Sequence, residues 1–307
     1  MSKCYVVHRV DKNNVGDMAS NPLQYFLKPN EYTVVDITNV SATHIPDNTP
    51  VIAGGGGLLA NDFMEDALRV LSVPSDKNNL LNLANSYWKE VSASNKGIRD
   101  EFFAKLNPLV KEFIDKLNNN KGPRIIWGAG HNCDYVKKIK GTLEYPAWLR
   151  DFDLVGVRDY GQQYEWAPCA SCMHPALRKQ YTIKNDVIWF EHKKQLLKST
   201  EFGTDPIPRF INSGDNIDQT IEILGSANTI ITNSYHGAYW GILLKKRVIV
   251  VEAWSSKFNA MRHQPYFLGK GEHWKDYIER VPTYNTAIDE CISATETYWN
   301  KVKGYIK

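Results

Sequence analysis

Short apolar runs alternate with amphipathic stretches along most of the chain. Apolar runs bounded by polar or glycine-rich turns are typical of strands buried in a parallel sheet. In the first half these runs are Cys4–Arg9, Tyr32–Ile37, Pro50–Ala53, Arg124–Trp127 and Leu154–Val157. Apolar residues at helical spacing predict helices between them, at Met18–Leu27, Asp62–Leu71 and Lys96–Asn118, where Pro108 kinks or splits the last.

A second set of alternating elements begins near Asn185. We expect strands at Asp186–Phe190, Phe210–Asn212, Thr229–Thr232 and Arg247–Val251. We expect helices from Asp215, which can cap the first of them, to about Ser226, then at Gly237–Leu244 and Thr286–Val302.

Strands that alternate with helices predict parallel sheets covered on both faces. Two successive sets predict an α/β protein with two facing Rossmann-like, doubly wound domains and a cleft between them. We place the domains at residues 1–182 and 183–307, with a terminal helix in the second. Ligands bind at the carboxyl ends of the strands in such sheets, so the loops there are the candidate sites.

Composition and charge narrow the function classes. The 307 residues are 43% hydrophobic and 23% charged, as in an ordinary globular protein. The 37 basic and 34 acidic residues are interleaved and no nucleic-acid motif is present, so we expect no nucleic-acid partner. No apolar stretch approaches the roughly 20 residues of a transmembrane helix. A short N-terminal apolar run and an odd number of scattered cysteines predict a cytoplasmic protein with free thiols.

Four glycines, Gly54–Gly57, follow the third strand directly. Glycine lets backbone N–H groups approach a ligand closely or adopt positive φ, and such a nest favours an anion or a sugar oxygen. The surrounding residues match neither a P-loop nor a dinucleotide fingerprint. We take Gly55, Gly56 and Gly57 as an acceptor or anion loop, because a tight turn alone needs fewer glycines.

Three further loops in the first half carry polar side chains. Asp17 opens a helix after Asn14 and Gly16, where it either caps the helix or acts as an acid or base. His131, between Gly130 and Asn132, is either a proton-transfer group or a structural histidine. Arg158 ends a buried strand, so it needs an anionic partner, which is Asp159 or a ligand phosphate or carboxylate.

The loop after the Thr229–Thr232 strand opens a helix and contains Asn233, Ser234, His236 and Gly237. Helix N-termini bind anions through free backbone N–H groups. Capping by Ser234 explains one of these polar residues but not the histidine, so we favour a donor-binding site. Lys257, after the next strand, is a further candidate for binding phosphate.

Cysteine spacing leaves a metal site as a minor alternative. Cys169 and Cys172 form a C-x-x-C pair followed by His174, and Cys133 could add a ligand. One such pair is too few for the four ligands that zinc takes. We therefore expect buried free thiols and no metal.

The motifs NVGDM, VIAGGGGLL, RIIWGAGHN, VGVRD and ITNSYHGAYWGILLKKRVIVV together resemble the polysaccharide pyruvyl transferase family, over Asn14 to Val251. The resemblance implies a glycosyltransferase-B-like fold. It also implies transfer of a pyruvyl group from phosphoenolpyruvate to a sugar of a glycan, forming a ketal, with no cofactor required.

By the same resemblance, Arg158 and His236 would hold the phosphate and carboxylate of phosphoenolpyruvate, with His131 at the same site. Asp17 would be the acid or base near the acceptor. Many members have arginine where this chain has Ser234, whereas others share its Ser-aromatic-His-Gly sequence. The donor site here therefore has one positive charge fewer than in those members.

Two other functions remain open from the sequence. A glycosyltransferase of the same fold would use a nucleotide sugar, with Glu252 or Asp215 on the ribose. A non-catalytic sugar-binding protein would tolerate the loss of His236 and Arg158 without loss of binding.

Overall fold

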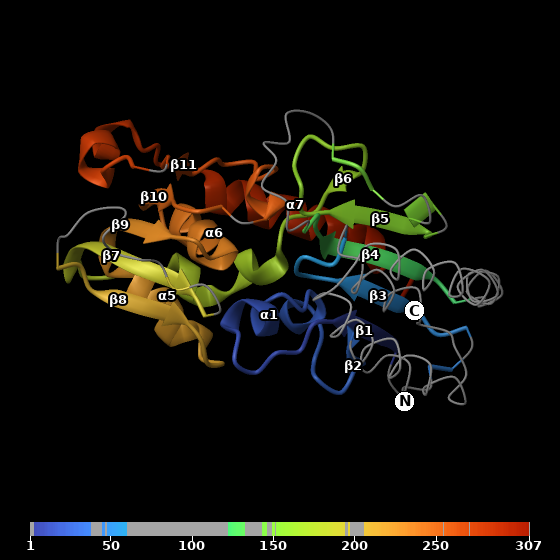
Figure 1. Ribbon diagram of the computed structural model, residues 1–307. Helices are drawn as coiled ribbons and strands as arrows, with labels where there is room; N and C mark the ends of the chain where they lie inside the picture. Colours follow the sequence, from blue (N-terminus) through green and yellow to red (C-terminus); the bar gives the residue numbers. More distant parts are fainter. Residues whose placement is uncertain are drawn as a thin grey trace, which may run out of the picture.

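The computed structural model describes residues 3–37, 45–46, 48–59, 122–132, 143–145, 149–150, 152–193, 196, 206–253, 255–269 and 271–306. The helices expected at Asp62–Leu71 and Lys96–Asn118, and Cys133, lie outside these residues. The described part is an α/β structure with two parallel sheets flanked by helices, an arrangement compatible with two Rossmann-like domains (Figure 1).

The first lobe is built on a sheet of six parallel strands in the order β2-β1-β3-β4-β5-β6. The strands are β1 Cys4–His8, β2 Tyr32–Asp36, β3 Val51–Gly54, β4 Arg124–Ala129, β5 Leu154–Val157 and β6 Glu165–Trp166. Val6 of β1 pairs with Val34 and Ile52 on either side. Val6 and Ile52 face one core and their neighbours Val7 and Ala53 face the other, which explains the continuous apolar runs.

The second lobe is built on a sheet of five parallel strands in the order β11-β10-β9-β7-β8. The strands are β7 Asn185–His192, β8 Arg209–Asn212, β9 Ala227–Thr232, β10 Arg247–Val250 and β11 Tyr266–Phe267. The prediction of two parallel sheets is therefore confirmed. The two-residue strands β6 and β11 were not expected, because they are too short to show a hydrophobic pattern.

Both sheets have the same strand order. In the first sheet β1 lies between β2 and β3, and in the second β7 lies between β8 and β9. The winding direction reverses at β1/β3 in the first lobe and at β7/β9 in the second. In doubly wound sheets, ligands bind outside the carboxyl ends of the strands at this reversal point. The loops after these four strands are Asp11–Asn14, Gly55–Gly57, the turn at Lys193, and Asn233–Ser234.

The described α-helices are α1 Val15–Ala19, α5 Ile217–Gly225, α6 Tyr235–Leu243 and α7 Ala287–Val302, and short 3₁₀ turns include η5 Ala170–Met173, η6 Pro175–Arg178 and η8 Ser256–Phe258. The expectation of a continuous helix over Met18–Leu27 is wrong. Helix α1 ends at Ala19, and Pro22 keeps the residue before it out of helical geometry.

The two other helix starts differ slightly from expectation. Asn216, not Asp215, caps α5, because its side chain accepts a hydrogen bond from the backbone N–H of Gln219. Helix α6 begins at Tyr235 rather than Gly237, and the Ser234 side chain caps it. His236 therefore lies inside the first turn of the helix and not in the preceding loop.

Helix α7 belongs to the cores of both lobes. Its first turns, with Ile288 and Cys291, pack in the core around α6, whereas Tyr298 and Val302 pack in the core under the first sheet (Figure 1). The last strand of the first sheet ends at Trp166 and the first strand of the second begins at Asn185. Because α7 follows the second sheet and its last turns pack under the first, the chain returns to the first lobe after the second is complete.

Every residue of α6 is buried. On its outer side it contacts the segment between β6 and β7, where Trp240 donates to the Ser171 hydroxyl (3.0 Å) and the Tyr239 hydroxyl donates to the Cys169 carbonyl (3.0 Å). A helix that is apolar all round is stable only when it is enclosed. Helix α1 belongs to this same core through Val15 and Ala19, so the lobes share apolar packing.

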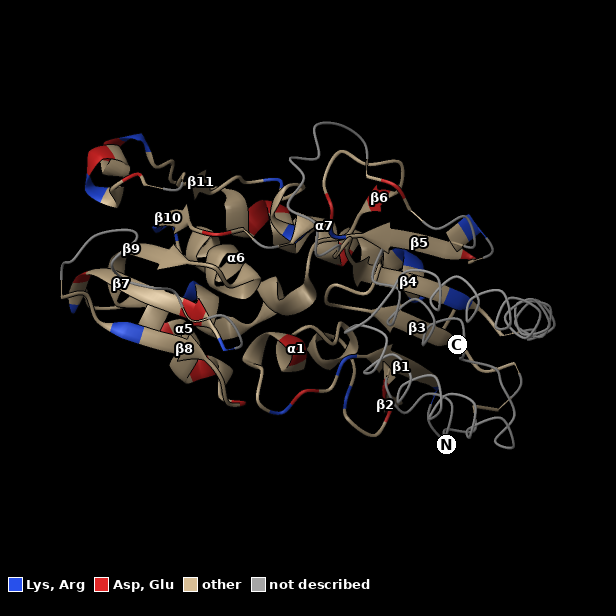
Figure 2. Cartoon of the chain, in the orientation of Figure 1, with Lys and Arg blue, Asp and Glu red and all other residues tan. Residues whose placement is uncertain are grey.

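Charged residues are interspersed along both lobes (Figure 2), as the sequence predicted. No helix in the described part of the chain has the length and apolar character needed to cross a membrane.

Candidate functional site

Polar side chains from the two lobes meet at the carboxyl ends of the strands. Nδ1 of His131, after β4, lies 2.7 Å from the hydroxyl oxygen of Ser256 in η8. The hydroxyl of Ser255 donates to Oδ1 of Asn132 at 2.5 Å. The loops after β4 and β10 therefore contact each other directly, although they are more than a hundred residues apart in the sequence.

The loops after β1 and β7 form a second set of contacts between the lobes. Nζ of Lys193 donates to the Asp11 carboxylate (2.6 Å) and to the Asn13 carbonyl (3.1 Å). Nδ2 of Asn212 lies 3.3 Å from Oδ1 of Asn14 and 3.2 Å from the hydroxyl of Ser234. Asn14 and Ser234, two predicted site residues, are thus linked through a residue that the sequence analysis did not select.

Arg158 is 4% exposed, and its charge acts on both His131 and His236. Its guanidinium carbon is 4.1 Å from the centre of the Tyr235 ring, so the cation stacks on an aromatic face. Its Nε and Nη2 have no hydrogen-bond partner among the described residues. A buried guanidinium with unused donors is costly unless an anion binds to it.

Asp159 was the alternative partner for Arg158. Its carboxylate accepts hydrogen bonds from the His131 backbone N–H (2.7 Å) and the Tyr145 hydroxyl (2.8 Å). Burial raises the pKa of Asp159, and the nearby Arg158 charge opposes that shift. Asp159 therefore offsets part of the arginine charge at a distance and leaves its donors available for a ligand.

His236 lies within electrostatic range of Arg158 and packs against α1. Its ring lies directly over the backbone of Gly16, and its Nε2 is 3.7 Å from the thiol of Cys169. Burial, with the charges of Arg158 and Lys257, lowers the pKa of His236 well below its usual value. His236 is therefore neutral at pH 7 and available as a hydrogen-bond donor or acceptor.

Gly16 allows this contact only because it has no side chain. A Cβ at this position would lie 2.6 Å from Cγ of His236 and closer still to Nδ1. We expect Gly16→Ala to destabilise the protein by about 1–3 kcal/mol, because the ring or the whole of α1 must move. Denaturant unfolding monitored by circular dichroism measures this change.

A double variant provides the control for Gly16. In a His236→Ala background the ring is absent, so Gly16→Ala should cost less, and the two changes should be non-additive by about 1 kcal/mol or more. Additive costs would show that the overlap is relieved elsewhere and that Gly16 does not hold the histidine in place.

His131 is buried, and burial lowers its pKa below the usual histidine value. Its ring meets the Tyr145 ring edge to face, with 6.0 Å between centroids. The neighbouring Gly130 has no room for a side chain, because the Arg158 side chain occupies that space. His131, Gly130 and Arg158 are thus brought together as the sequence analysis expected.

Asp17 lies in the first turn of α1, next to Gly16, which contacts the His236 ring. Its Oδ2 accepts from Nδ2 of Asn14 at 2.9 Å, and Asn14, not Asp17, caps the helix by accepting from the Gly16 N–H. Burial is the main cause that raises the pKa of Asp17 to about 6, and Asp11 adds to it. Of the two roles open to Asp17, capping is therefore excluded, and its pKa suits proton transfer near neutral pH.

The glycine run has a packing explanation. Gly55 and Gly56 have positive φ, at 79° and 84°. A side chain on Gly55 would strike the Ser20 backbone and one on Gly57 would strike Asn132. The Gly55 N–H donates to the Trp127 carbonyl, so it is not available to a ligand. A ligand-binding role for this loop stays a prediction.

Two of the predicted site residues after β9, Asn233 and Gly237, have structural roles. Oδ1 of Asn233 accepts the His192 backbone N–H at 2.7 Å, and Gly237 packs tightly against Phe190 and Thr232. The charge of Lys257 lowers the pKa values of both His236 and Asp17, so it lies within electrostatic range of both. Of the predicted donor-binding residues in the second lobe, His236 and Lys257 are therefore the two whose charges or contacts reach the first lobe.

The cysteines are free thiols in the described part of the chain. Cys172 contacts the Thr295 hydroxyl at 3.3 Å, and His174 accepts the Ala176 backbone N–H. Among the described residues, no three histidine, cysteine or acidic side chains are grouped so that they could hold a metal ion. Cys169, however, contacts His236 and belongs to the candidate site.

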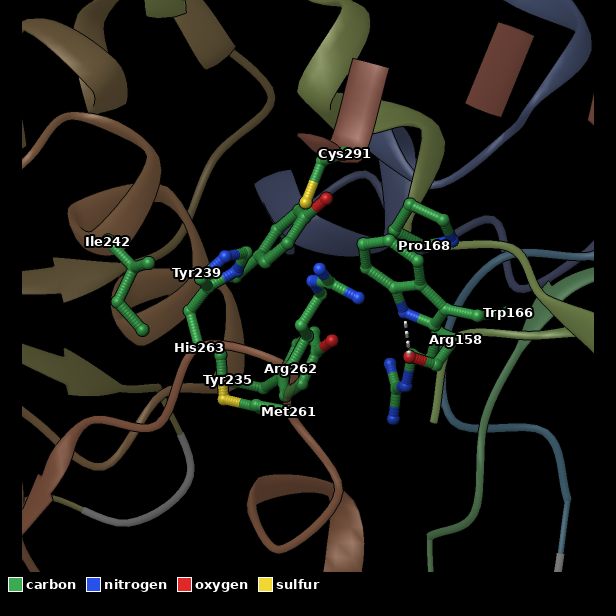
Figure 3. Close-up of a pocket in the computed structure, with 10 residues that line it drawn as sticks. All are labelled: Arg158, Trp166, Pro168, Tyr235, Tyr239, Ile242, Met261, Arg262, His263 and Cys291. Carbon is green, nitrogen blue, oxygen red and sulfur yellow. Dashed lines mark hydrogen bonds between the residues drawn. The ribbon is translucent and has the colours of Figure 1, made fainter. Parts of the chain in front are cut away.

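A small cavity lies next to Arg158, on the side of α7 (Figure 3). It has about 20 Å³ of space, enough for about one ordered water molecule. No acidic residue is found among the described residues that line it, which are Arg158, Trp166, Pro168, Tyr235, Tyr239, Ile242, Met261, Arg262, His263 and Cys291.

Sequence analysis missed several residues of this region, among them Ser256, Arg262 and Cys169. The loop after β10 could have indicated Ser256 and Arg262, because the carboxyl ends of all parallel strands of a sheet lie on one edge. The C-x-x-C spacing marked Cys169 only as a possible metal ligand or a buried free thiol, because its contact with His236 arises from the packing of η5 on α6. Asp215 and Glu252, named for the nucleotide-sugar alternative, are both exposed.

Comparisons of the chain with protein-family models, curated proteins and solved structures find no match.

Proposed function

We propose that the protein is a transferase that moves the pyruvyl group of phosphoenolpyruvate to a glycan sugar, forming a cyclic ketal. The observation that carries this proposal is Arg158, a buried cation with unused donors whose charge acts on two neutral histidines, His131 and His236. A site of this kind binds a small anion by charge-assisted hydrogen bonds in a water-poor environment.

The proposed reaction needs a cation on the phosphate, a proton for C3 of the enol and a base for the attacking hydroxyl. Protonation of C3 makes C2 electrophilic, one sugar hydroxyl adds to C2, phosphate leaves with the C–O bonding electrons, and a second hydroxyl closes the ketal. The two hydroxyls lose two protons in all, of which C3 gains one and the leaving phosphate gains the other.

The residues of the site match these needs. Arg158 would neutralise the phosphate as it leaves. Asp17, with a pKa of about 6, is mostly a carboxylate at pH 7 and can accept a hydroxyl proton, while its protonated fraction can donate one. His236 and His131, both neutral, would hold donor oxygens or relay protons.

Substrates need more room than the cavity beside Arg158 provides, so we propose that the lobes separate to open a cleft. Several contacts between the lobes are single hydrogen bonds, such as His131 to Ser256 and Asn14 to Asn212. Each is worth only about 1 kcal/mol net because water replaces the lost partner. Donor binding to Arg158 would favour the closed state.

Thermal stabilisation by a ligand panel tests the proposal. A ligand that binds the folded state raises its melting temperature with concentration. We expect phosphoenolpyruvate to stabilise the protein and nucleotide sugars to have no effect. Stabilisation by a nucleotide sugar alone would contradict the proposal and support a glycosyltransferase.

A further inference from the structure

Asn212, the last residue of β8, contacts the capping residues of two helices. Its Nδ2 lies 3.3 Å from Oδ1 of Asn14, the N-cap of α1, and 3.2 Å from the hydroxyl of Ser234, the N-cap of α6. An amide NH₂ group has two hydrogens, so one is available for each cap. The first turns of the two helices contain Asp17 and His236, which both belong to the candidate site.

The hydrogen bonds of Asn14 fix the orientation of its side-chain amide. Oδ1 of Asn14 accepts the backbone N–H of Gly16 at 3.1 Å, and its Nδ2 donates to the Asp17 carboxylate at 2.9 Å. The reverse orientation would place an NH₂ group against an N–H and an oxygen against a carboxylate. Asn14 therefore caps α1 and donates to Asp17 at the same time.

The orientation of the Asn212 amide follows from that of Asn14. Oδ1 of Asn14 faces it, so Asn212 must present its NH₂ group, since two amide oxygens at 3.3 Å would repel each other. Its own Oδ1 then has no hydrogen-bond partner among the described residues, although Asn212 is only 3% exposed. A buried oxygen without a partner is costly, so the two caps and not the packing of Oδ1 determine how this amide is placed.

The second lobe holds Asn212 in place against the first. Asn212 pairs with His192 in the parallel register of β8 and β7. Helix α1 follows β1 of the first sheet, yet Val15 and Ala19 pack in the core of the second lobe (Figure 1). The start of α1 therefore meets the second lobe through its polar cap as well as through its apolar side.

We infer that Asn212 is a positioning residue that sets the orientation of the Asp17 carboxylate through Asn14. It acts across the boundary between the lobes, so Asp17 is fully oriented only while the end of β8 contacts the start of α1. This inference deepens the proposed function and rests on it for the use of an oriented Asp17 in proton transfer.

Several charges act on Asp17 besides the bond from Asn14. Burial has the largest effect on its pKa and raises it, Asp11 raises it further, and three cations lower it, namely Arg9, Lys257 and Lys193. Asn212 is uncharged, so an uncharged replacement leaves all these charges in place. A weaker hydrogen bond from Asn14 stabilises the carboxylate less and therefore raises the pKa of Asp17.

The test measures the pKa of Asp17 in the intact protein by carbon NMR of isotope-labelled aspartate carboxyl groups, with the signal assigned from Asp17→Asn. Asn212→Leu keeps the branching of the side chain and removes its donor. We expect it to raise the pKa of Asp17 by about half a unit or more, because Asn14 is held less firmly. Asn212→Ser removes the same contact with a smaller polar side chain and should give the same result.

Asn228→Leu is the matched control. Asn228 also donates through Nδ2 to a side-chain oxygen, Oδ1 of Asp186, at 3.0 Å, but it is exposed and lies at the start of β9. Its replacement should leave the pKa of Asp17 unchanged.

An Asn14→Gly background separates positioning from local packing. Glycine is tolerated as an N-cap and has no amide side chain, so this change should raise the pKa of Asp17 by itself. In this background Asn212→Leu should cause no further rise, because the connection through Asn14 is absent. A rise of equal size in both backgrounds, or an unchanged pKa in Asn212→Leu and Asn212→Ser, would overturn the inference.

The NMR measurement does not depend on turnover. For the proposed pyruvyl transfer, Asn212→Leu should lower kcat about tenfold and change KM by about twofold or less, because a misplaced base slows the chemical step. Absence of phosphoenolpyruvate turnover with an Asn14-dependent pKa shift would refute pyruvyl transfer and keep the role of Asn212. Turnover without the shift would refute the role of Asn212 alone.

Discussion

Replacing Asp17 with asparagine is expected to lower kcat for the proposed pyruvyl transfer by about 10²- to 10⁴-fold, the usual contribution of a general acid or base. Asparagine has nearly the same shape and can still bond to Asn14, so the fold around α1 should remain intact. What it loses is the ability to take up or release a proton.

The pH dependence gives this prediction a second readout. Because burial raises the pKa of Asp17 from 3.8 to about 6, the folded state binds a proton between these pH values that the unfolded state has released. Asp17 therefore makes the fold less stable as pH rises from about 4 to 6. Asp17→Asn should lack this decline and be at least as stable as the unsubstituted protein at pH 7.

Steady-state rates from about pH 5 to 8 and thermal melts from about pH 4 to 7 measure the two effects. Activity of the unsubstituted protein should rise through an apparent pKa near 6 if the carboxylate is the base. Asp218→Asn, at an exposed position in α5, is the matched control and should change neither. An Asp17→Asn variant that keeps its kcat would remove Asp17 from the mechanism.

Arg158→Ala should weaken donor binding by about 2 kcal/mol or more, roughly a 30-fold rise in the dissociation constant. A hydrogen bond to a charged group contributes about 1.5–3 kcal/mol, and the arginine offers two unused nitrogens, Nε and Nη2, to the donor. Titration of phosphoenolpyruvate by calorimetry measures the loss.

Arg158→Lys separates charge from geometry at the same position. Lysine keeps the charge but not the planar fork or the stack on Tyr235, so it should recover only part of the affinity. The melting temperatures of both variants show whether the Asp159 carboxylate, which keeps its hydrogen bonds from His131 and Tyr145, destabilises the fold once Arg158 is replaced. Unchanged donor affinity in Arg158→Ala would be incompatible with the proposed function.

Much of the fold was predictable because buried parallel strands and amphipathic helices have distinct periodicities. The runs around Val6, Ile52, Ile125 and Ile230 mark strands whose two faces both pack in apolar cores. Local chemistry also predicted the Ser234 cap. The break after Ala19 was missed because a helical pattern continued to Leu27, although Pro22 interrupts it.

The candidate site residues were selected from the connections that follow the strands, including the first turns of the next helices. Asp17, His131, Arg158 and His236 were selected from such loops, and the structure brings them into one region between the lobes. The contacts that define their chemistry were not predictable. The overlap of His236 with Gly16, its contact with Cys169 and the bond from His131 to Ser256 join segments that are distant in the sequence.

By itself, the sequence determined the order of strands and helices and the polar loops at the carboxyl ends, because hydrophobic period and turn chemistry are local properties. Only the tertiary structure decided the protonation of Asp17 and His236, the unused donors of Arg158 and the place of Arg262 at the same cavity. These depend on burial and on distances between atoms from different lobes, which no short stretch of sequence encodes.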